Sequence, residues 1–365
     1  MKLDQYFIKF TENLAYLDLK ETARQDLLKD LPLPIYIDDM TKGIATGQMK
    51  ESIDLDKILT AMLINIGADK DFLYNEEYKI VLSKYLSNIN KFAINKAMEI
   101  ADLDINKALL ILRGANNINP LDNYSAYFYA RLLWPLAYES EEKYKDDFIR
   151  ESLRILQETI ANDENFAISY YELGNIYRNL GEYVKARNYY NKALEKTDSP
   201  EARDETYNRL TEIDDNAEIE EALYFIGKSD FNNAIKKLTR LLSNKKRADA
   251  YYYLAVAYQN IGQYENSTMA FTNALDLGAE FRELYNDYAI SLYMLKREKE
   301  ALEIIEEGLE KFPQDPRLTY NKIQINLVMG NLSQGKKDIE ELLSYDDLSD
   351  EIRENLKAIK EHYKI

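Results

Sequence analysis

Residues 166–200 read FAISYYELGNIYRNLGEYVKARNYYNKALEKTDSP, and residues 248–281 read ADAYYYLAVAYQNIGQYENSTMAFTNALDLGAEF. The two stretches share an ordered pattern: a small residue, an aromatic, a glycine and an aromatic, then a small residue, an aromatic and Ala-Leu. In the first stretch these are Gly174, Tyr177, Gly181, Tyr183, Ala186, Tyr190, Ala193 and Leu194. In the second they are Ala255, Tyr258, Gly262, Tyr264, Ser267, Phe271, Ala274 and Leu275. Spacings of three and four residues place each set on one helical face.

This pattern predicts two antiparallel helices, A and B, joined by a tight turn at the glycine. Small residues midway along A and early in B let the two backbones approach closely, and the large aromatics fill the space on either side. The scarcity of helix breakers, 12 glycines and 7 prolines in 365 residues, favours helices throughout.

The pattern resembles the tetratricopeptide repeat, a helix pair with a period of about 34 residues. The small helix-B position recurs 44, 34, 48, 33, 34 and 34 residues apart, at Ala108, Ser152, Ala186, Ala234, Ser267, Ala301 and Gly335. The small helix-A position recurs at Gly174, Ala222, Ala255 and Ala289, and closing prolines occur at Pro120, Pro200 and Pro313. The resemblance implies an all-α, right-handed superhelical solenoid of antiparallel helix pairs.

We expect the repeat array over residues 89–349, with a helical N-terminal region at 1–88 and a capping helix at 350–365. The expected repeats span about 89–122, 123–166, 167–200, 215–247, 248–281, 282–315 and 316–349. The step of 48 predicts an insertion at 201–214, as an added turn or a short helix. The step of 44 predicts another near Glu139–Asp147, where Trp134-Pro135 should kink or break a helix. The last repeat is degenerate, with Ile323 at the small helix-A position.

Residues 1–88 show the repeat only weakly. Helical periodicity is expected at roughly 4–17, 21–30, 55–67 and 76–88. The prolines of LPLPIYIDD (31–39) predict an extended linker, and the two glycines of 41–48 predict a loop. This region either caps the solenoid or contains eroded repeats.

Composition limits the possible partners and locations. The net charge of −17 argues against nucleic acid. The basic stretch that contains Lys236, Lys237, Arg240, Lys245, Lys246 and Arg247 is a localisation signal, an anion patch or a solvated helix face. There is no cysteine and no signal peptide, and the longest near-apolar run, 58–68, falls short of the roughly 20 residues that span a bilayer. We therefore expect a cytoplasmic, bacterial protein without membrane contact.

Catalytic and metal-binding motifs are not expected. The stretch 43–47 has the wrong spacing for a P-loop, and Gln48 stands where the lysine belongs. The stretch that begins at Asp102 resembles a calcium loop but lacks its glycine and its final glutamate, so Asp104 is expected to cap a helix. His362 is the only histidine. The carboxylates of 212–221 are read as a solvated face. The sequence predicts no enzyme activity, cofactor or metal.

The resemblance also implies a ligand groove lined by the A helices. Carried over position by position, the family pattern assigns groove-facing places to Tyr171, Asn175, Arg178, Asn179, Tyr252, Val256, Gln259, Asn260, Asn286, Ile290, Tyr293, Tyr320 and Gln324. Side-chain amides can both donate to and accept from a peptide backbone, and tyrosines offer contact area at low entropic cost.

Two functions follow from this groove. The first is a scaffold that binds a protein or peptide partner. The alternative is a peptide-responsive receptor, similar to bacterial tetratricopeptide regulators, whose N-terminal region binds an effector. An enzyme is a distant third. The sequence fixes neither the partner nor the oligomeric state.

Overall fold

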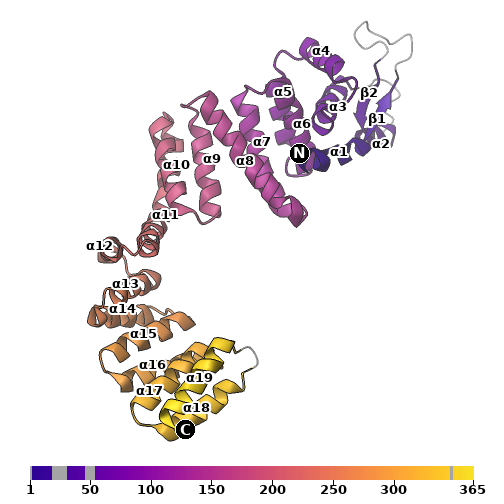
Figure 1. Ribbon diagram of the computed structural model, residues 1–365. Coiled ribbons are helices and arrows are strands. Elements are labelled where there is room, and N and C mark those ends of the chain that lie inside the picture. Colours follow the sequence, from indigo (N-terminus) through magenta and orange to yellow (C-terminus); the bar gives the residue numbers. More distant parts are fainter. Residues whose placement is uncertain (1, 19–30, 46–53, 346–347) are drawn as a thin grey trace. The chain divides into compact units, whose positions relative to one another are not determined.

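The computed structural model describes residues 2–18, 31–45, 54–345 and 348–365, and it is built almost wholly of helices (Figure 1). The chain divides into two compact units, unit 1 (Met1–Glu212) and unit 2 (Ile213–Ile365). Consecutive helices pack against one another over residues 89–196 in unit 1 and over residues 231–363 in unit 2, which confirms the all-α repeat architecture.

The helix pairs follow the expected order. In unit 1 they are α5 (Ile89–Ile100), α6 (Ile105–Ile118), α7 (Asn123–Glu139), α8 (Glu142–Asn162), α9 (Ala167–Asn179) and α10 (Tyr183–Lys196). The long helix α11 (Pro200–Gly227) begins in unit 1 and ends in unit 2. Unit 2 continues with α12 (Phe231–Asn244), α13 (Ala248–Asn260), α14 (Tyr264–Asp276), α15 (Arg282–Met294), α16 (Glu298–Lys311), α17 (Pro316–Val328), α18 (Leu332–Leu343) and α19 (Asp350–Tyr363).

Two expected irregularities differ from the structure in detail. Residues 201–214 add helical turns, as one of the two alternatives expected, but they form no separate short helix, because they extend the following A helix into the single helix α11. Pro135 lies inside α7, which continues to Glu139, so this helix is not broken there.

The small residues lie where the sequence pattern places them, between the paired helices. The side chains at the six non-glycine helix-B positions, Ala108, Ser152, Ala186, Ala234, Ser267 and Ala301, are fully buried. At the helix-A position of α9, a Cβ on Gly174 would lie 2.5 Å from the ring of Tyr190. Where helix B carries serine, its hydroxyl donates to a carbonyl of helix A: Ser152 to Ala130 at 2.7 Å and Ser267 to Ala255 at 2.9 Å. The contact therefore stays close without an unsatisfied polar group.

We predict that Ala186→Phe destabilises the protein. The buried Ala186 leaves no room for a ring between α9 and α10, so the substitution overpacks the contact at a cost of about 1–3 kcal/mol or more. Asn188→Phe, at an exposed position of the same helix, is the matched control. Thermal unfolding checks this, and equal melting temperatures of the two variants would contradict the assigned packing face.

The turns between A and B helices share one backbone geometry. Gly181, Gly262 and Gly330 adopt positive φ (76°, 73° and 82°), and Ser229 and Lys296 adopt φ of 58° in register with them. In each turn the N–H of the next residue reaches back into the last turn of helix A, as from Glu182 to the carbonyl of Tyr177 at 2.9 Å. This is the Schellman arrangement that ends helices in a left-handed residue. Glycine adopts it without the steric cost that a Cβ brings.

We predict that Lys296→Gly stabilises the protein by about 0.5–1 kcal/mol, because removing the Cβ relieves the left-handed strain by more than glycine adds in unfolded-state entropy. Glu303→Gly, at an exposed position inside α16, should instead destabilise by about 1 kcal/mol. Chemical denaturation checks both variants. A loss of stability in Lys296→Gly would refute the strain argument.

The N-terminal region departs most from the expected helices. Helix α1 (Lys2–Ile8) passes into a 3₁₀ turn (Lys9–Asn13), and β1 (Leu14–Leu17) then pairs antiparallel with β2 (Leu33–Tyr36), so a helix over 4–17 is wrong. The extended segment expected at 31–39 ends at Tyr36. Helix α2 (Ile37–Ala45) follows it and occupies the first part of the expected loop at 41–48. The helix expected at 21–30, like residues 46–48, lies outside the described residues.

The expected helices at 55–67 and 76–88 correspond to α3 (Leu55–Ala68) and α4 (Asn75–Tyr85). Helices α3 and α6 touch backbone to backbone, since a Cβ on Gly114 would lie 2.0 Å from the carbonyl oxygen of Leu63. The N-terminal elements share one hydrophobic core with the helices through α9.

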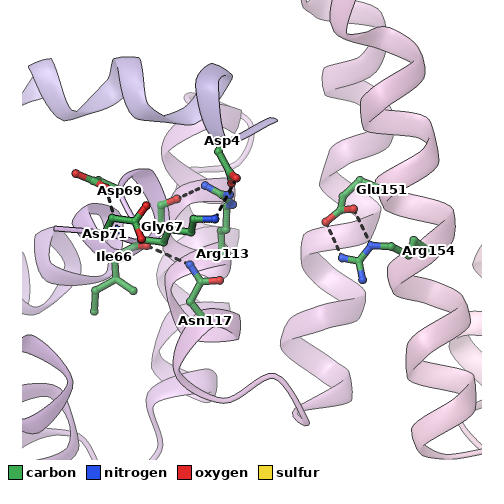
Figure 2. Close-up of polar contacts among 10 residues, drawn as sticks. Asp4, Ile66, Gly67, Asp69, Asp71, Arg113, Asn117, Glu151 and Arg154 are labelled. Carbon is green, nitrogen blue, oxygen red and sulfur yellow. Dashed lines mark hydrogen bonds and ion pairs between the residues drawn. The ribbon is translucent and has the colours of Figure 1, made fainter. Parts of the chain in front are cut away.

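The guanidinium of Arg113, whose side chain is 13% exposed, joins the N-terminal helix to this core. Figure 2 shows Arg113 of α6 lying between Asp4 and the end of α3, where it ion-pairs with Asp4 and donates to the Gly67 carbonyl at 2.5 Å. Asn117 donates to the Ile66 carbonyl at 3.1 Å, so two α6 side chains satisfy free carbonyls at the end of α3. Glu151 and Arg154, also drawn, form an ion pair on α8.

Candidate functional site

The described part of unit 1 contains a cavity of about 620 Å³, here called the unit 1 cavity. Its walls are the A helices α7 and α9 and the first turns of α11, with α10 at the floor. The lining residues are Tyr124, Tyr127, Arg131, Asn165, Phe166, Ala167, Ile168, Tyr171, Glu172, Asn175, Ala193, Thr197, Ala202, Glu205, Thr206 and Arg209. A volume of this size lies in the usual range of about 300–1,000 Å³ for ligand sites.

One end of the cavity is apolar and aromatic. Tyr124 meets Phe166 edge to face at a centroid distance of 5.1 Å, and Tyr127 meets Phe166 at 6.5 Å. The Tyr124 ring is 60% exposed and Ile168 is 38% exposed, so apolar surface faces the solvent here. Burying such surface on a partner is favourable at roughly 25 cal/mol per Å².

The other end is polar and largely hydrogen-bonded within itself. The Tyr171 hydroxyl donates to Glu205 at 2.5 Å, which connects α9 with α11. The Tyr190 hydroxyl donates to the Asn175 side-chain oxygen at 2.7 Å, which fixes the orientation of that amide. Arg209 pairs with Glu212 at 3.2 Å. These contacts hold the polar groups in place before any ligand arrives.

Glu172 differs from these groups because its carboxylate is weakly satisfied. Burial raises the pKa of the Glu172 carboxyl above its ordinary value, and the positive charge of Arg131 and a hydrogen bond from Asn175 offset this only in part. The bond from the Asn175 amide is long, 3.4 Å. A carboxyl with a raised pKa in a cleft is a recognised mark of a functional site.

The same place in the α15 repeat also carries an acid, Asp287, two residues before the small Ala289. Burial raises its pKa too. Asp287, however, accepts hydrogen bonds from Tyr252 at 3.0 Å and from Asn286 at 3.0 Å. The Asp287 carboxylate is thus hydrogen-bonded by neighbouring side chains, whereas the Glu172 carboxylate lines the cavity.

We predict that Glu172→Gln raises the melting temperature near neutral pH, on the order of 2–4 °C, because the amide removes a charge that burial disfavours. The folded-state pKa is raised, so the folded protein binds the proton more tightly than the unfolded chain. The contribution of the Glu172 carboxyl to the free energy of unfolding is therefore fully present below its ordinary pKa of 4.5. This contribution is lost as the pH rises through the pKa of the folded state. The advantage of Gln should thus shrink on acidification.

Thermal unfolding from acidic to neutral pH measures this difference. Glu164→Gln, at an exposed glutamate outside the cavity, removes the same charge without relieving burial and serves as the control. A gain for Glu172→Gln that is equal at all pH values would argue against a buried, titrating carboxyl.

The groove positions taken from the sequence pattern divide into several environments. Tyr171 and Asn175 line the unit 1 cavity, whereas Arg178 and Asn179 lie beyond it on α9, where Arg178 approaches Glu212 at 3.5 Å. Asn179 is exposed and accepts from Arg178 at 3.4 Å.

In unit 2 most side chains at the predicted groove positions form hydrogen bonds between neighbouring A helices. Tyr252 bonds Asp287, and Gln259 donates to the Asp287 carbonyl at 2.8 Å and to Ser291 at 2.9 Å. Asn286 accepts from Asn321 at 2.7 Å. These amides connect α13, α15 and α17.

The remaining unit 2 positions differ again. The Asn260 amide donates to the Val256 carbonyl of its own helix at 2.8 Å. Tyr320 packs against the hydrophobic cluster at the C-terminal end of unit 2, which includes Ile323, Leu327 and Ile339. Ile290, Tyr293 and Gln324 line a shallow notch of about 50 Å³ between α15 and α17.

Sequence reasoning missed the charged residues of the unit 1 cavity: Arg131, Glu172, Glu205 and Arg209. Glu172 and Asp287 occupy a helix-A place that the family pattern includes among groove positions, so that pattern could have found them. Glu205 and Arg209 lie inside the insertion 201–214, which has no counterpart in the repeat and gave no signal.

The two charged runs noticed in the sequence face each other within unit 2. Lys237 and Arg240 pair with Glu218 at 3.2 and 2.5 Å, and Lys245 pairs with Asp215 at 2.6 Å. The basic and acidic side chains of the two runs therefore neutralise much of each other's charge at the surface. Asp104 caps α6 by accepting from the N–H of Lys107, as expected, and His362 lies in the last turn of α19.

The part of the chain that the structure describes holds neither a metal-binding cluster nor a membrane-spanning helix. Across residues 2–18, 31–45, 54–345 and 348–365 there is no group of three His, Cys, Asp or Glu side chains placed to hold a metal ion. Among the helices of those same ranges, none combines the length and apolar character needed to cross a membrane.

Comparison with known proteins points to one family. Models of the tetratricopeptide repeat match residues 167–199 and residues 248–278. A search of curated proteins finds no matching sequence. Repeats of this type form protein-interaction scaffolds.

Several solved structures resemble parts of the chain. MamA protein is 17% identical over 55% of this chain and 96% of its own, with a TM-score of 0.37. YrrB, described as a TPR protein with an unusual peptide-binding site, is 17% identical over 56% of this chain and 97% of its own, with a TM-score of 0.38. PilW, a type IV pilus biogenesis factor, is 14% identical over 62% and 98%, with a TM-score of 0.40. Similarities at this level carry no conclusion about function.

Proposed function

Because the chain is a tetratricopeptide repeat protein, with repeats recognised at 167–199 and 248–278, we propose that it binds a segment of a partner protein in the unit 1 cavity. The observation that carries the proposal is the cavity itself, which opens between A helices of consecutive pairs. In repeat arrays the stacked helices create the extended surfaces that take partners.

The lining favours a peptide over a small metabolite. Neutral polar groups, among them Asn175, Thr197 and Thr206, are interspersed with aromatic surface, although the Thr206 hydroxyl donates to the Ala202 carbonyl and is left as an acceptor. A peptide backbone presents one donor and one acceptor per residue, which such groups can satisfy. Tyrosines supply rigid contact area.

Unit 2 supports a different role for its groove positions. Its A-helix amides and tyrosines are occupied by bonds to the neighbouring A helix. We infer that they hold the helices in register, and that the notch beside Ile290 offers a secondary contact.

The test is to fill the cavity without touching its charged groups. Ala202 is a half-buried lining residue of α11, so Ala202→Trp places an indole in the cavity. We predict a loss in affinity for the principal partner of about tenfold or more, because central contacts dominate binding energy. Asn191→Trp, at an exposed position of α10 outside the lining, is the matched control.

The measurement begins with quantitative pull-down and mass spectrometry for wild type and both variants, followed by calorimetry with the purified partner. Circular dichroism confirms that the variants stay folded. Equal capture by wild type and Ala202→Trp, or equal losses in both Trp variants, would place the interaction surface elsewhere.

A further inference from the structure

Within the proposed function, we infer that the unit 1 cavity selects an extended, uncharged peptide segment that carries one bulky apolar side chain. The argument rests on the charge balance of the lining, the location of its apolar surface and the character of Glu172.

The first step is the charge balance. Two of the lining residues are arginines, Arg131 and Arg209, and two are glutamates, Glu172 and Glu205. Arg131 attracts Glu172, Arg209 is paired with Glu212, and Glu205 accepts the Tyr171 hydroxyl, so each charged lining group already interacts within the protein. A charged ligand group buried here would give up its hydration without meeting a matched opposite charge, which is costly.

The second step concerns Glu172. Because burial disfavours its ionised form, this carboxyl disfavours a second negative charge beside it and favours a ligand N–H, from which its oxygens accept. Together with Asn175 beside it, it forms a pair of groups that suits the N–H and C=O of a peptide bond.

The third step is the apolar anchor. The aromatic part of the lining offers the exposed Tyr124 ring, which meets Phe166 edge to face, and the side chain of Ile168 lines the same cavity. Aromatic rings in edge-to-face geometry attract one another beyond area burial. A large apolar side chain of the ligand therefore fits at this end while its backbone lies at the polar end.

The experiment uses four defined probes, acetyl-Gly-Ser-X-Ser-Gly-amide with X as Phe, Leu, Lys or Glu, titrated into the full chain by NMR or calorimetry at physiological salt. The Phe and Leu probes should bind about tenfold or more tightly than the Lys and Glu probes. The Lys probe is the demanding comparison, because the net charge of −17 attracts it non-specifically.

Variants tie the preference to these residues. Tyr124→Ala should weaken the Phe probe by about fivefold or more, since the exposed ring is part of the anchor wall. The matched control Leu121→Ala removes a 74% exposed side chain outside the lining and should leave affinity unchanged. Glu172→Gln should bind within about threefold of wild type, because the amide keeps an oxygen that accepts a hydrogen bond.

Three results would overturn the inference. The first is tightest binding of the Lys or Glu probe, which would show that charge, not an apolar anchor, governs the site. The second is a loss of affinity for the Phe probe well beyond threefold in Glu172→Gln, which would show the same. Absence of binding by all four probes would also overturn it. The proposed function survives each result if Ala202→Trp still lowers capture of the cellular partner, and it fails separately if capture is unchanged.

Discussion

The close approach of helix A to helix B at the small residues is the constraint on which the rest of the structure depends. Gly174 lies against the Tyr190 ring with no room for a Cβ, and Ala186 is fully buried on the facing helix. This contact fixes how far each aromatic reaches. It places the Tyr190 hydroxyl 2.7 Å from Asn175, so the orientation of a cavity amide follows from a packing contact in the helix pair.

The insertion in α11 creates the site on this regular frame. The α11 wall of the unit 1 cavity consists of Ala202, Glu205, Thr206 and Arg209, all within residues 201–214. A repeat that began its A helix at the usual spacing would lack this wall. The added residues extend an existing helix, so they lengthen one face without interrupting the hydrogen bonds of its backbone.

The repeat was predictable because small residues at fixed intervals admit few alternatives, and each lies buried where the pattern requires. The N-terminal region was not. Its strands β1 and β2 pair across a separation in sequence that periodicity does not detect, and tertiary contact outweighs local helical preference there. For the candidate site, the pattern indicated Tyr171 and Asn175. It could not indicate that Tyr252 and Gln259, at equivalent positions, form hydrogen bonds to the neighbouring A helix.

The contrast between the two equivalent acids is consistent with the binding role proposed for Glu172. A buried carboxylate that serves packing acquires donors, as Asp287 does from Tyr252 and Asn286. Glu172 keeps one long bond and a raised pKa at the edge of a cavity, an arrangement that lowers stability in the free protein. The donors on the neighbouring insertion wall serve other acceptors, because Arg209 pairs with Glu212 and the Thr206 hydroxyl donates to the Ala202 carbonyl at 2.7 Å. A ligand N–H supplies the hydrogen bond that Glu172 lacks in the free protein. The complex therefore gains the stability that the free protein does not have at this position.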